Sequence, residues 1–246
     1  MRTIAVIPAR FQSKRLPGKP LADIHGKTLI QRVYERATRC ALVDRVIVAT
    51  DDERIGSAVE AFGGEVVFTS VDHVSGSDRV AEAVATLDVE LVVNVQGDEP
   101  LIDPGAIDDA VALAKRTPDA IVSLKCALED PEQLHDDNVV KVVTDRRGFA
   151  LYFSRAAIPA VRRDDVDGVR RFKHLGLYVY PKPVLTSLTQ MEPTRLEQAE
   201  RLEQLRALEN GIPIRLCETD SDSIGVDTQE DLERVRSLVA HQVAIK

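Results

Sequence analysis

Through the first half of this chain, short apolar runs alternate with segments of helical periodicity, and this alternation restricts the folds open to the sequence. The apolar runs are rich in Val, Ile and Ala, which is typical of strands buried on both faces. They occupy residues 3–9, 45–50, 65–69 and 91–95, and the helical segments between them are 28–40, 51–62 and 78–87. This order predicts an α/β fold with a doubly wound, largely parallel sheet.

The second half contains similar segments in a less regular order. We predict strands at 121–126, 139–144, 149–154 and 175–180, and helices at 104–116, 195–209 and 228–243. Because no repeat, low-complexity tract or clear linker interrupts the 246 residues, we interpret 1–246 as a single domain. Segment 160–173 is the most charged and least periodic part, and we expect it to be a mobile loop.

Composition disfavours several classes of function. The formal net charge of −8 argues against a general nucleic-acid-binding surface. Run 3–9 is too short for a signal sequence or a membrane span. The cysteines Cys40, Cys126 and Cys217 are far apart and lack metal-ligand spacing, which is typical of reduced thiols. We therefore expect a cytoplasmic protein without nucleic-acid binding or membrane insertion.

The first strand leads into a strongly basic loop. Up to Leu21 the chain carries no acid and five cations, namely Arg2, Arg10, Lys14, Arg15 and Lys19. Clustered like charges repel, so this loop on an acidic protein favours an anion site, with a solvated charged loop as the alternative. Open α/β sheets bind phosphates at the carboxyl ends of such strands, and Gly18 permits close approach of the backbone.

Two common nucleotide-binding motifs do not fit. His25-Gly26-Lys27-Thr28 resembles the end of a P-loop, but Leu21 stands where that motif requires its first glycine. Without that glycine the nest of backbone donors cannot form. No G-x-G-x-x-G pattern follows the first strand, which disfavours a dinucleotide-binding function.

Two acidic residues are candidate metal ligands with ordinary structural alternatives. Asp98, within Gln96-Gly97-Asp98-Glu99-Pro100, follows the fourth strand and belongs to the same sheet edge as the basic loop. Mg²⁺ binds through one or two carboxylates plus phosphate oxygens, which favours Asp98 as a ligand over a turn-forming role. For Asp227 the residues alone favour a helix cap, made either by Thr228 with Asp231 or by Asp227 with Glu230.

Three further segments have a structural explanation beside a binding role. Ser75-Gly76-Ser77-Asp78-Arg79 opens a helix and is typical of a cap. His174, Gly176, Tyr178 and Tyr180 alternate along a strand, so they share one face that could hydrogen-bond a polyhydroxylated ligand. Glu197, Glu200 and Glu203 are spaced as neighbours on one helix, where a solvated charged face is the usual explanation.

From about residue 3 to 237, the chain resembles the 3-deoxy-manno-octulosonate (Kdo) cytidylyltransferase family. The first motif alone also admits the sialic acid cytidylyltransferases, whereas the later motifs together favour Kdo. The motifs are IPARFQSKRLPGKPL, IVATDD, NVQGDEP, ALYFSRAAIP, HLGLYVY, LEQLR and GVDTQEDLERV. The chain departs from the family at Ser77-Asp78, where Thr-Glu is common, and in segment 160–173.

The resemblance implies a Rossmann-like nucleotidyltransferase fold and a role for each matching residue. About 150–210 would contribute the sugar-acid pocket and dimer contacts. Nucleotide binding would fall to Ala9, Arg10, Ser13, Arg15, Lys19, Ser75, Gly76, Ser77 and Arg79. Sugar binding would fall to Gln96, Arg155, His174, Tyr178, Glu200 and Glu203. The catalytic residues would be Arg10, Lys19 and Asp98, and Asp98 and Asp227 would hold Mg²⁺, which reverses the capping interpretation of Asp227.

The activity implied is attack of the anomeric hydroxyl of Kdo on the α-phosphorus of CTP, giving CMP-Kdo and pyrophosphate for lipopolysaccharide biosynthesis. Both substrates are anions, so Mg²⁺ and fixed cations would have to offset their repulsion. The resemblance also implies a homodimer. Alternatives are a related acceptor such as 8-amino-Kdo or sialic acid, a sugar-1-phosphate nucleotidyltransferase, and a non-catalytic nucleotide-binding regulator.

Overall fold

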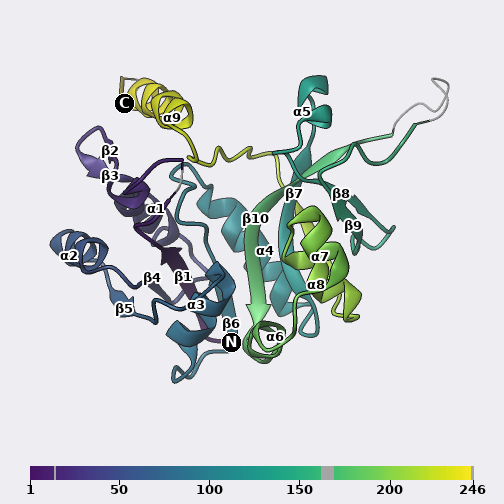
Figure 1. Ribbon diagram of the computed structural model, residues 1–246, viewed down its shortest axis with the longest axis horizontal. Coiled ribbons are helices and arrows are strands. Elements are labelled where there is room, and N and C mark those ends of the chain that lie inside the picture. Colours follow the sequence, from purple (N-terminus) through teal and green to yellow (C-terminus); the bar gives the residue numbers. More distant parts are fainter. Residues whose placement is uncertain (14, 162–168, 245–246) are drawn as a thin grey trace.

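One mixed sheet organises the molecule (Figure 1). The computed structural model describes residues 1–13, 15–161 and 169–244. Its main strands are β1 (Thr3–Ala9), β4 (Arg45–Thr50), β5 (Val66–Phe68), β6 (Leu91–Asn94), β7 (Ile121–Ala127), β8 (Lys141–Thr144), β9 (Ala150–Ser154), β10 (Phe172–Pro181) and β11 (Ile214–Glu218). Seven of them follow the order β11-β7-β10-β6-β1-β4-β5, and β8 joins β9 to β10.

The apolar runs are buried because helices cover both faces of this sheet. In β1, Ala5, Ile7 and Ala9 pack into one core cluster, whereas Ile4 and Val6 pack into the other. The first cluster also contains side chains of α1 (Leu29–Ala37), α2 (Glu53–Ala61), α4 (Pro104–Lys115) and α9 (Gln229–Ala244). The second contains side chains of α3 (Gly76–Val84), α6 (Lys182–Thr189) and α8 (Gln204–Glu209). The doubly wound α/β prediction is confirmed.

The sheet is largely but not wholly parallel. β1 pairs in parallel with both β4 and β6, and β4 pairs in parallel with β5, as predicted. β11 is also parallel to β7. β10 runs antiparallel to β6 and β7, with a register irregularity between Leu175 and Tyr178. β10 therefore joins the regular first half to the strands of the second half.

The predicted helix 195–209 is wrong as a single element. It is two short helices, α7 (Arg195–Glu200) and α8, because Arg201 adopts a left-handed conformation with φ 54° that ends α7. The chain turns there, and the next side chain, Leu202, is buried. The expectation that Glu197, Glu200 and Glu203 are neighbours on one helix therefore fails.

Several elements are additional to the sequence prediction. They are the β2–β3 hairpin (Asp23–Ile24 and Lys27–Thr28), the 3-10 turn Lys19–Leu21, α5 (Pro131–His135), α6 and β11. The His25–Thr28 segment that resembles a P-loop forms the turn and second strand of that hairpin. Of the predicted mobile loop 160–173, residues 162–168 lie outside the described residues, and Phe172 is already the first residue of β10. Lys14 of the basic loop also lies outside the described residues.

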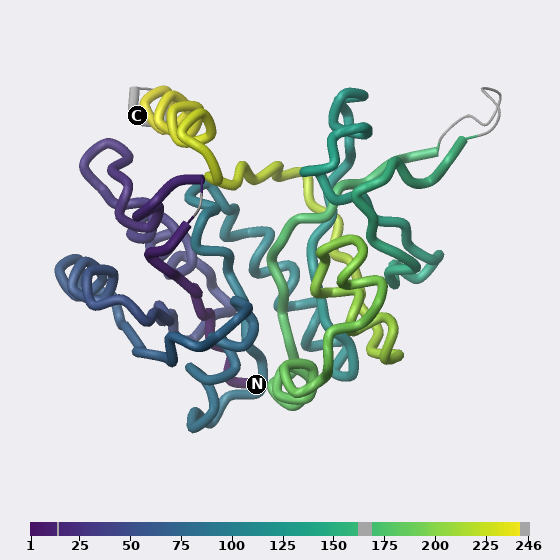
Figure 2. The backbone as a smooth tube through the Cα atoms, in the orientation of Figure 1, coloured from purple at the N-terminus to yellow at the C-terminus, as the bar shows by residue number. Residues whose placement is uncertain are grey.

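The C-terminal helix returns to the N-terminal half, as the tube in Figure 2 shows. There Arg236 of α9 donates from Nε to the carbonyl of Asp23 in β2, at 2.9 Å. The segment before α9 is held as well, because the amide of Val226 donates to the carbonyl of Asp98, at 2.8 Å. In the described part of the chain, no helix combines the length and apolar character needed to cross a bilayer.

Candidate active site

A pocket of about 970 Å³ lies where β1 and β6 end. It collects most of the residues that the sequence assigns to nucleotide and metal. Those that line it are Ala9, Arg10, Ser13, Arg15, Lys19, Ser75, Gly76, Arg79, Asp98 and Asp227. Ser77 is the exception, since it is buried on α3 and does not line the pocket. The predicted convergence of the basic loop with the two acids is therefore confirmed.

Phe11 and Gly18 make the main contacts in the described part of the basic loop. Gly18 adopts φ +70°, a conformation that L side chains rarely adopt, and its amide donates to the carbonyl of Phe11 at 3.1 Å. The Phe11 ring lies against Gly18, where an added Cβ would come within 3.1 Å of Cζ. The guanidinium carbon of Arg54 lies 3.3 Å from the centroid of the same ring. Aromatic packing thus holds Phe11 and Gly18, on either side of the loop, against each other.

A close backbone approach brings the acidic turn to the basic loop. At Gly97 an added Cβ would lie 2.7 Å from the carbonyl oxygen of Pro8, so only glycine fits without a shift. This contact joins the end of β1 to the segment that follows β6. As a result Asp98 lies beside Lys19, although 79 residues separate them in the sequence.

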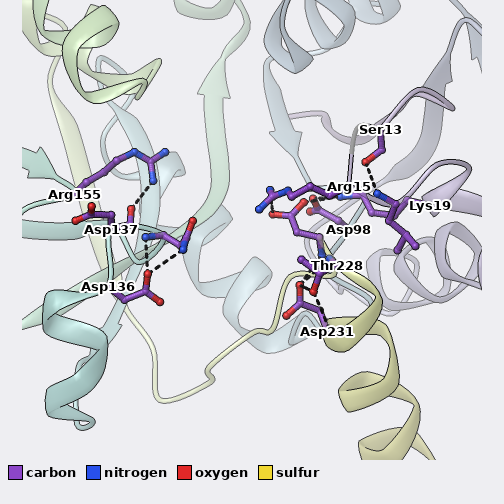
Figure 3. A network of polar contacts seen from close by, with 12 residues as sticks. Ser13, Arg15, Lys19, Asp98, Asp136, Asp137, Arg155, Thr228 and Asp231 are labelled. Carbon is purple, nitrogen blue, oxygen red and sulfur yellow. Dashed lines mark hydrogen bonds and ion pairs between the residues drawn. The ribbon is translucent and has the colours of Figure 1, made fainter.

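Lys19 contacts both acids of the pocket, and Figure 3 shows it near Asp98. Its Nζ is 2.8 Å from Asp98 Oδ2 and 3.0 Å from Asp227 Oδ1. Arg15 adds a second cation, 2.8 Å from the other oxygen of Asp227. Burial alone would lower the pKa of Lys19, but the charges and hydrogen bonds of Asp98 and Asp227 outweigh burial and raise that pKa. Lys19 is therefore a fixed ammonium in the pocket.

The structure decides between the two caps that the sequence allows for α9. The carboxylate of Asp231 accepts from the amide of Thr228 at 2.8 Å, and the Thr228 hydroxyl accepts from the amide of Asp231 at 3.2 Å. Because this pair satisfies the start of the helix, the Asp227 side chain is left for Lys19 and Arg15. The interpretation of Asp227 as the capping residue is wrong.

The segment that opens α3 is both a cap and a pocket wall. Ser75 Oγ accepts from the amide of Asp78, and the Asp78 carboxylate accepts from the amide of Ser75, each at 3.1 Å. Arg79 reaches the pocket from one turn further, with its guanidinium 2.6 Å from Thr69 Oγ1 and 3.3 Å from Asp51. The segment therefore caps α3, as the structural explanation predicts, and also lines the pocket.

Sequence reasoning gave no role to two titratable residues, one that lines the pocket and one beside Asp98. His73 lines the pocket, and its ring contacts the carboxylate of Glu82 on α3. The only sign in the sequence that His73 lies at the pocket was its position two residues before Ser75. Glu99 follows Asp98 directly; burial, together with the charge of Asp98, raises the pKa of Glu99 to about 7.

The acids of the pocket fit a magnesium ion that is shared with a phosphate ligand. In the described residues no group of three or more His, Cys, Asp or Glu side chains could hold a metal by itself. Asp98 and Asp227 nevertheless approach the same ammonium, so their oxygens face a common point. One or two carboxylates completed by phosphate oxygens is the usual protein environment of Mg²⁺.

A second polar group follows β10. The rings of His174 and Tyr178 lie 5.4 Å apart and those of Tyr178 and Tyr180 5.6 Å apart, so the predicted shared face is confirmed. Ser123 Oγ lies 2.8 Å from His174 Nε2 and donates to the carbonyl of Leu177 at 2.7 Å. Because the serine has a single proton and donates it to this carbonyl, its oxygen accepts from His174 Nε2. The neutral imidazole is therefore protonated at Nε2, and Nδ1 is free to accept a hydrogen bond. Burial lowers the pKa of His174 to about 3.

Glu200 and Arg155 form the other part of this group. The carboxylate of Glu200 accepts from Ser154 Oγ at 2.6 Å and from the amide of Arg155 at 2.9 Å. Glu203 precedes α8, and its charge adds to burial in raising the pKa of Tyr178. None of these residues lines the pocket of Lys19.

Gln96 connects the two groups. It lines the pocket of Lys19, and its side-chain amide donates to the carbonyl of Gly176 in β10 at 3.1 Å. The remaining predicted sugar residues, Arg155, His174, Tyr178, Glu200 and Glu203, therefore lie around β9, β10, α7 and α8, with Gln96 as the link.

Comparisons with known proteins agree with this arrangement. The family model for cytidylyltransferases matches residues 4–219. A 3-deoxy-manno-octulosonate cytidylyltransferase from Syntrophotalea carbinolica is 56% identical over 245 residues, 96% of this chain and 98% of that protein. One from Solibacter usitatus is 53% identical over 238 residues, with 96% and 94% covered. A solved structure of CMP:2-keto-3-deoxy-manno-octonic acid synthetase complexed with CTP has a TM-score of 0.94 and 43% identity, covering 98% of this chain and 100% of that one.

A doubly wound sheet with cations and acids facing one pocket at its strand ends is the arrangement of a nucleotidyltransferase, and this chain belongs to the cytidylyltransferase family. Within that family it is a member of the 3-deoxy-manno-octulosonate cytidylyltransferases, to which its relatives connect it over nearly the full length. The family resemblance and the Rossmann-like fold predicted from the sequence are confirmed.

Proposed function

We propose that this chain transfers CMP from CTP to Kdo and releases pyrophosphate. The observation that carries the proposal is the meeting of Lys19, Asp98 and Asp227 in one pocket with the basic loop. That pocket offers fixed cations for a triphosphate and carboxylates for its metal. The CTP complex of the structurally similar CMP:2-keto-3-deoxy-manno-octonic acid synthetase supports CTP as the nucleotide. The names of the relatives support Kdo as the acceptor.

In this proposal the loop residues bind the triphosphate and the segment that opens α3 binds the cytidine. Arg10 and Lys19 lie nearest the reacting phosphate and stabilise the charge that develops on it. Ala9, Ser13, Arg15, Ser75, Gly76 and Arg79 complete the nucleotide site. Mg²⁺, held by Asp98 and Asp227, supplies positive charge to the phosphates when it is bound.

The sugar acid is recognised by the group around β10. Arg155 suits a carboxylate because its planar guanidinium can donate two parallel hydrogen bonds, which a lysine cannot. His174 offers Nδ1 as an acceptor to a sugar hydroxyl, and Tyr178 adds a hydroxyl beside it. Gln96 borders both groups, so it is suited to hold the acceptor next to the nucleotide.

The setting of the reaction is also part of the proposal. We infer a cytoplasmic homodimer that supplies lipopolysaccharide biosynthesis. On β9, within the 150–210 part, Leu151 is 63% exposed, and a dimer contact there would cover it. Cys40 and Cys126 are free and buried, as in proteins of reducing compartments.

A pyrophosphate-release screen tests the activity. The purified protein is supplied with Mg²⁺, each of the four ribonucleoside triphosphates, and Kdo, 8-amino-Kdo, sialic acid or a sugar 1-phosphate. We expect release with CTP and Kdo above every other pair. Preference for another acid would assign a different acceptor to the enzyme. Pyrophosphate release with a sugar 1-phosphate would assign it to a different reaction class. Binding of CTP without pyrophosphate release from any acid would favour a non-catalytic regulator.

A further inference from the structure

Lys141 is a buried cation that hydrogen-bonds backbone carbonyls. It belongs to β8 and is 0% exposed. Its Nζ donates to the carbonyl of Asp136 at 2.9 Å and to that of Val139 at 2.6 Å. Burying an ammonium costs free energy unless polar partners replace its water, so this lysine fixes the conformation of turn 136–139.

The same turn contacts a second cation. Arg155 donates from Nη1 to the carbonyl of Asp137 at 2.7 Å (Figure 3). Within the turn, Asp136 Oδ1 accepts from the amide of Asn138 at 2.8 Å and from its side-chain nitrogen at 3.0 Å. One backbone conformation of the turn therefore serves three sets of contacts. They are the two bonds from Lys141, the bonds within the turn, and the bond from Arg155 to the carbonyl of Asp137.

The orientation of Arg155 depends on two carbonyls. Besides the bond to Asp137, its Nε donates to the carbonyl of Glu200 at 2.8 Å. A guanidinium has five N–H donors, so three remain for another ligand after these two bonds. Strand register keeps the parts together, because Lys141 is paired with Ser154, the neighbour of Arg155, across β8 and β9.

We propose that Lys141 is a positioning residue for the sugar acid: it holds turn 136–139 so that the Asp137 carbonyl aims Arg155 at the substrate carboxylate. The inference deepens the proposed function and rests on the role that it gives to Arg155. Lys141 has no exposed surface, so it does not touch the substrate. The nucleotide residues lie in the pocket of Lys19, which turn 136–139 does not line. Loss of Lys141 should therefore affect the acid and spare the nucleotide.

The first test compares two lysines that make the same kind of contact. Lys141→Met removes the ammonium and keeps most of the volume of the side chain. Lys182→Met is the matched control, because Lys182 Nζ also donates to two carbonyls, those of Ala85 at 3.1 Å and Leu87 at 2.6 Å, on another turn. We expect Lys141→Met to raise the KM for Kdo at least about tenfold, while the KM for CTP stays within about twofold. Lys182→Met should leave both KM values unchanged.

A second variant reaches the same turn from its exposed side. Asp136→Ala removes the two side-chain bonds within the turn and leaves its backbone bond from Val139 to Asp136. Because Asp136 is exposed, this variant tests the inference if Lys141→Met does not fold. We expect the same selective rise in the KM for Kdo, of smaller size. A double-mutant cycle of Lys141→Met with Arg155→Lys should be strongly non-additive, because both changes remove one function.

Several results would overturn the inference. In a folded Lys141→Met protein, these are an unchanged KM for Kdo or an equal rise in the KM values for Kdo and CTP. Additive effects in the double-mutant cycle would also overturn it. If Lys141→Met does not fold, an unchanged KM for Kdo in Asp136→Ala would do so. A failure of the proposed function looks different, because the wild-type protein would then release no pyrophosphate from CTP and Kdo, and this inference would fall with it.

Discussion

Lys19 resolves an electrostatic conflict between two acids that the fold brings together. Asp98 and Asp227 each lie within hydrogen-bond distance of its Nζ, and its side chain is only 14% exposed. Charges in such a partly buried site interact more strongly than in water, so the ammonium offsets a repulsion that solvent alone would screen poorly. The same ammonium is available to phosphate oxygens in the pocket, where a fixed cation needs little reorganisation.

Replacement of Lys19 should therefore slow the reaction severely. For Lys19→Met we expect kcat to fall by roughly 10²–10³-fold, as for the loss of one donor to a developing anion. Steady-state pyrophosphate release measures this. Lys27→Met is the control, because Lys27 also binds a carboxylate, that of Glu35 at 2.7 Å, but belongs to the β2–β3 hairpin. Equal kcat values for the two variants would contradict a role of Lys19 in turnover.

Asp98 tests the metal side of the same cluster. For Asp98→Asn we expect magnesium-dependent turnover to be suppressed with the fold intact, because the amide keeps the shape of the carboxylate and loses its charge. Titration of activity with Mg²⁺, together with circular dichroism, checks this. Asp130→Asn is a matched control, since Asp130 caps α5 and asparagine caps equally well. Wild-type turnover in Asp98→Asn would remove Asp98 from the mechanism.

Among the elements, β10 combines a buried histidine with a row of aromatic rings. His174 packs against Phe153 and Tyr178, with ring centroids 4.9 and 5.4 Å away. Because burial lowers its pKa from the ordinary 6.5 to about 3, the folded protein keeps this ring neutral over a pH range in which the unfolded chain protonates it. The element should therefore lose stability as the pH falls from 6.5 towards 3.

The size of this effect follows from proton linkage. Between those two pKa values the unfolded state binds one more proton, so the free energy of unfolding falls by about 1.4 kcal/mol per pH unit on acidification. For His174→Gln we expect the loss between pH 7 and pH 5 to be smaller than in the wild type by about 2 kcal/mol. Urea unfolding at both pH values measures it, with the exposed His135→Gln as control. Identical losses in wild type and His174→Gln would contradict a neutral His174.

Comparison of elements shows what the sequence could predict. The strands of the first half were found almost to the residue, because strands covered on both faces need uninterrupted apolar side chains. The break at Arg201 was missed because a left-handed arginine leaves no compositional mark. Asp227 could not be assigned from the residues alone, because two caps were locally equivalent and only the contact with Lys19 separates them. The position of Asp98 beside the basic loop could be predicted, because the strands that precede these two segments end at the same edge of the sheet.

On the scale of the whole molecule, the candidate site is assembled from both ends of the chain. The contact between Lys19 and Asp227 joins residues 208 positions apart, and it depends on the return of α9 to the N-terminal half. Val226, Leu232, Val235 and Val239 bury that return in the same core cluster as β1. A ligand that binds both Lys19 and Asp227 therefore bridges the chain ends and should stabilise the fold globally.

This bridging can be measured without turnover. At a CTP concentration of about 100 times its Kd, in the presence of Mg²⁺, binding to the folded state alone should add about 2.7 kcal/mol to the free energy of unfolding. In Asp227→Asn we expect CTP to lose most of the stabilisation that depends on Mg²⁺, because the side chain from the C-terminal end of the chain no longer carries a negative charge. Urea unfolding with and without a chelator separates the two contributions, and Asp231→Asn, at the cap of α9, controls for damage to the helix itself. If CTP stabilised Asp227→Asn as much as the wild type, the metal would be bound without the C-terminal segment, and the site would be confined to the first half of the chain.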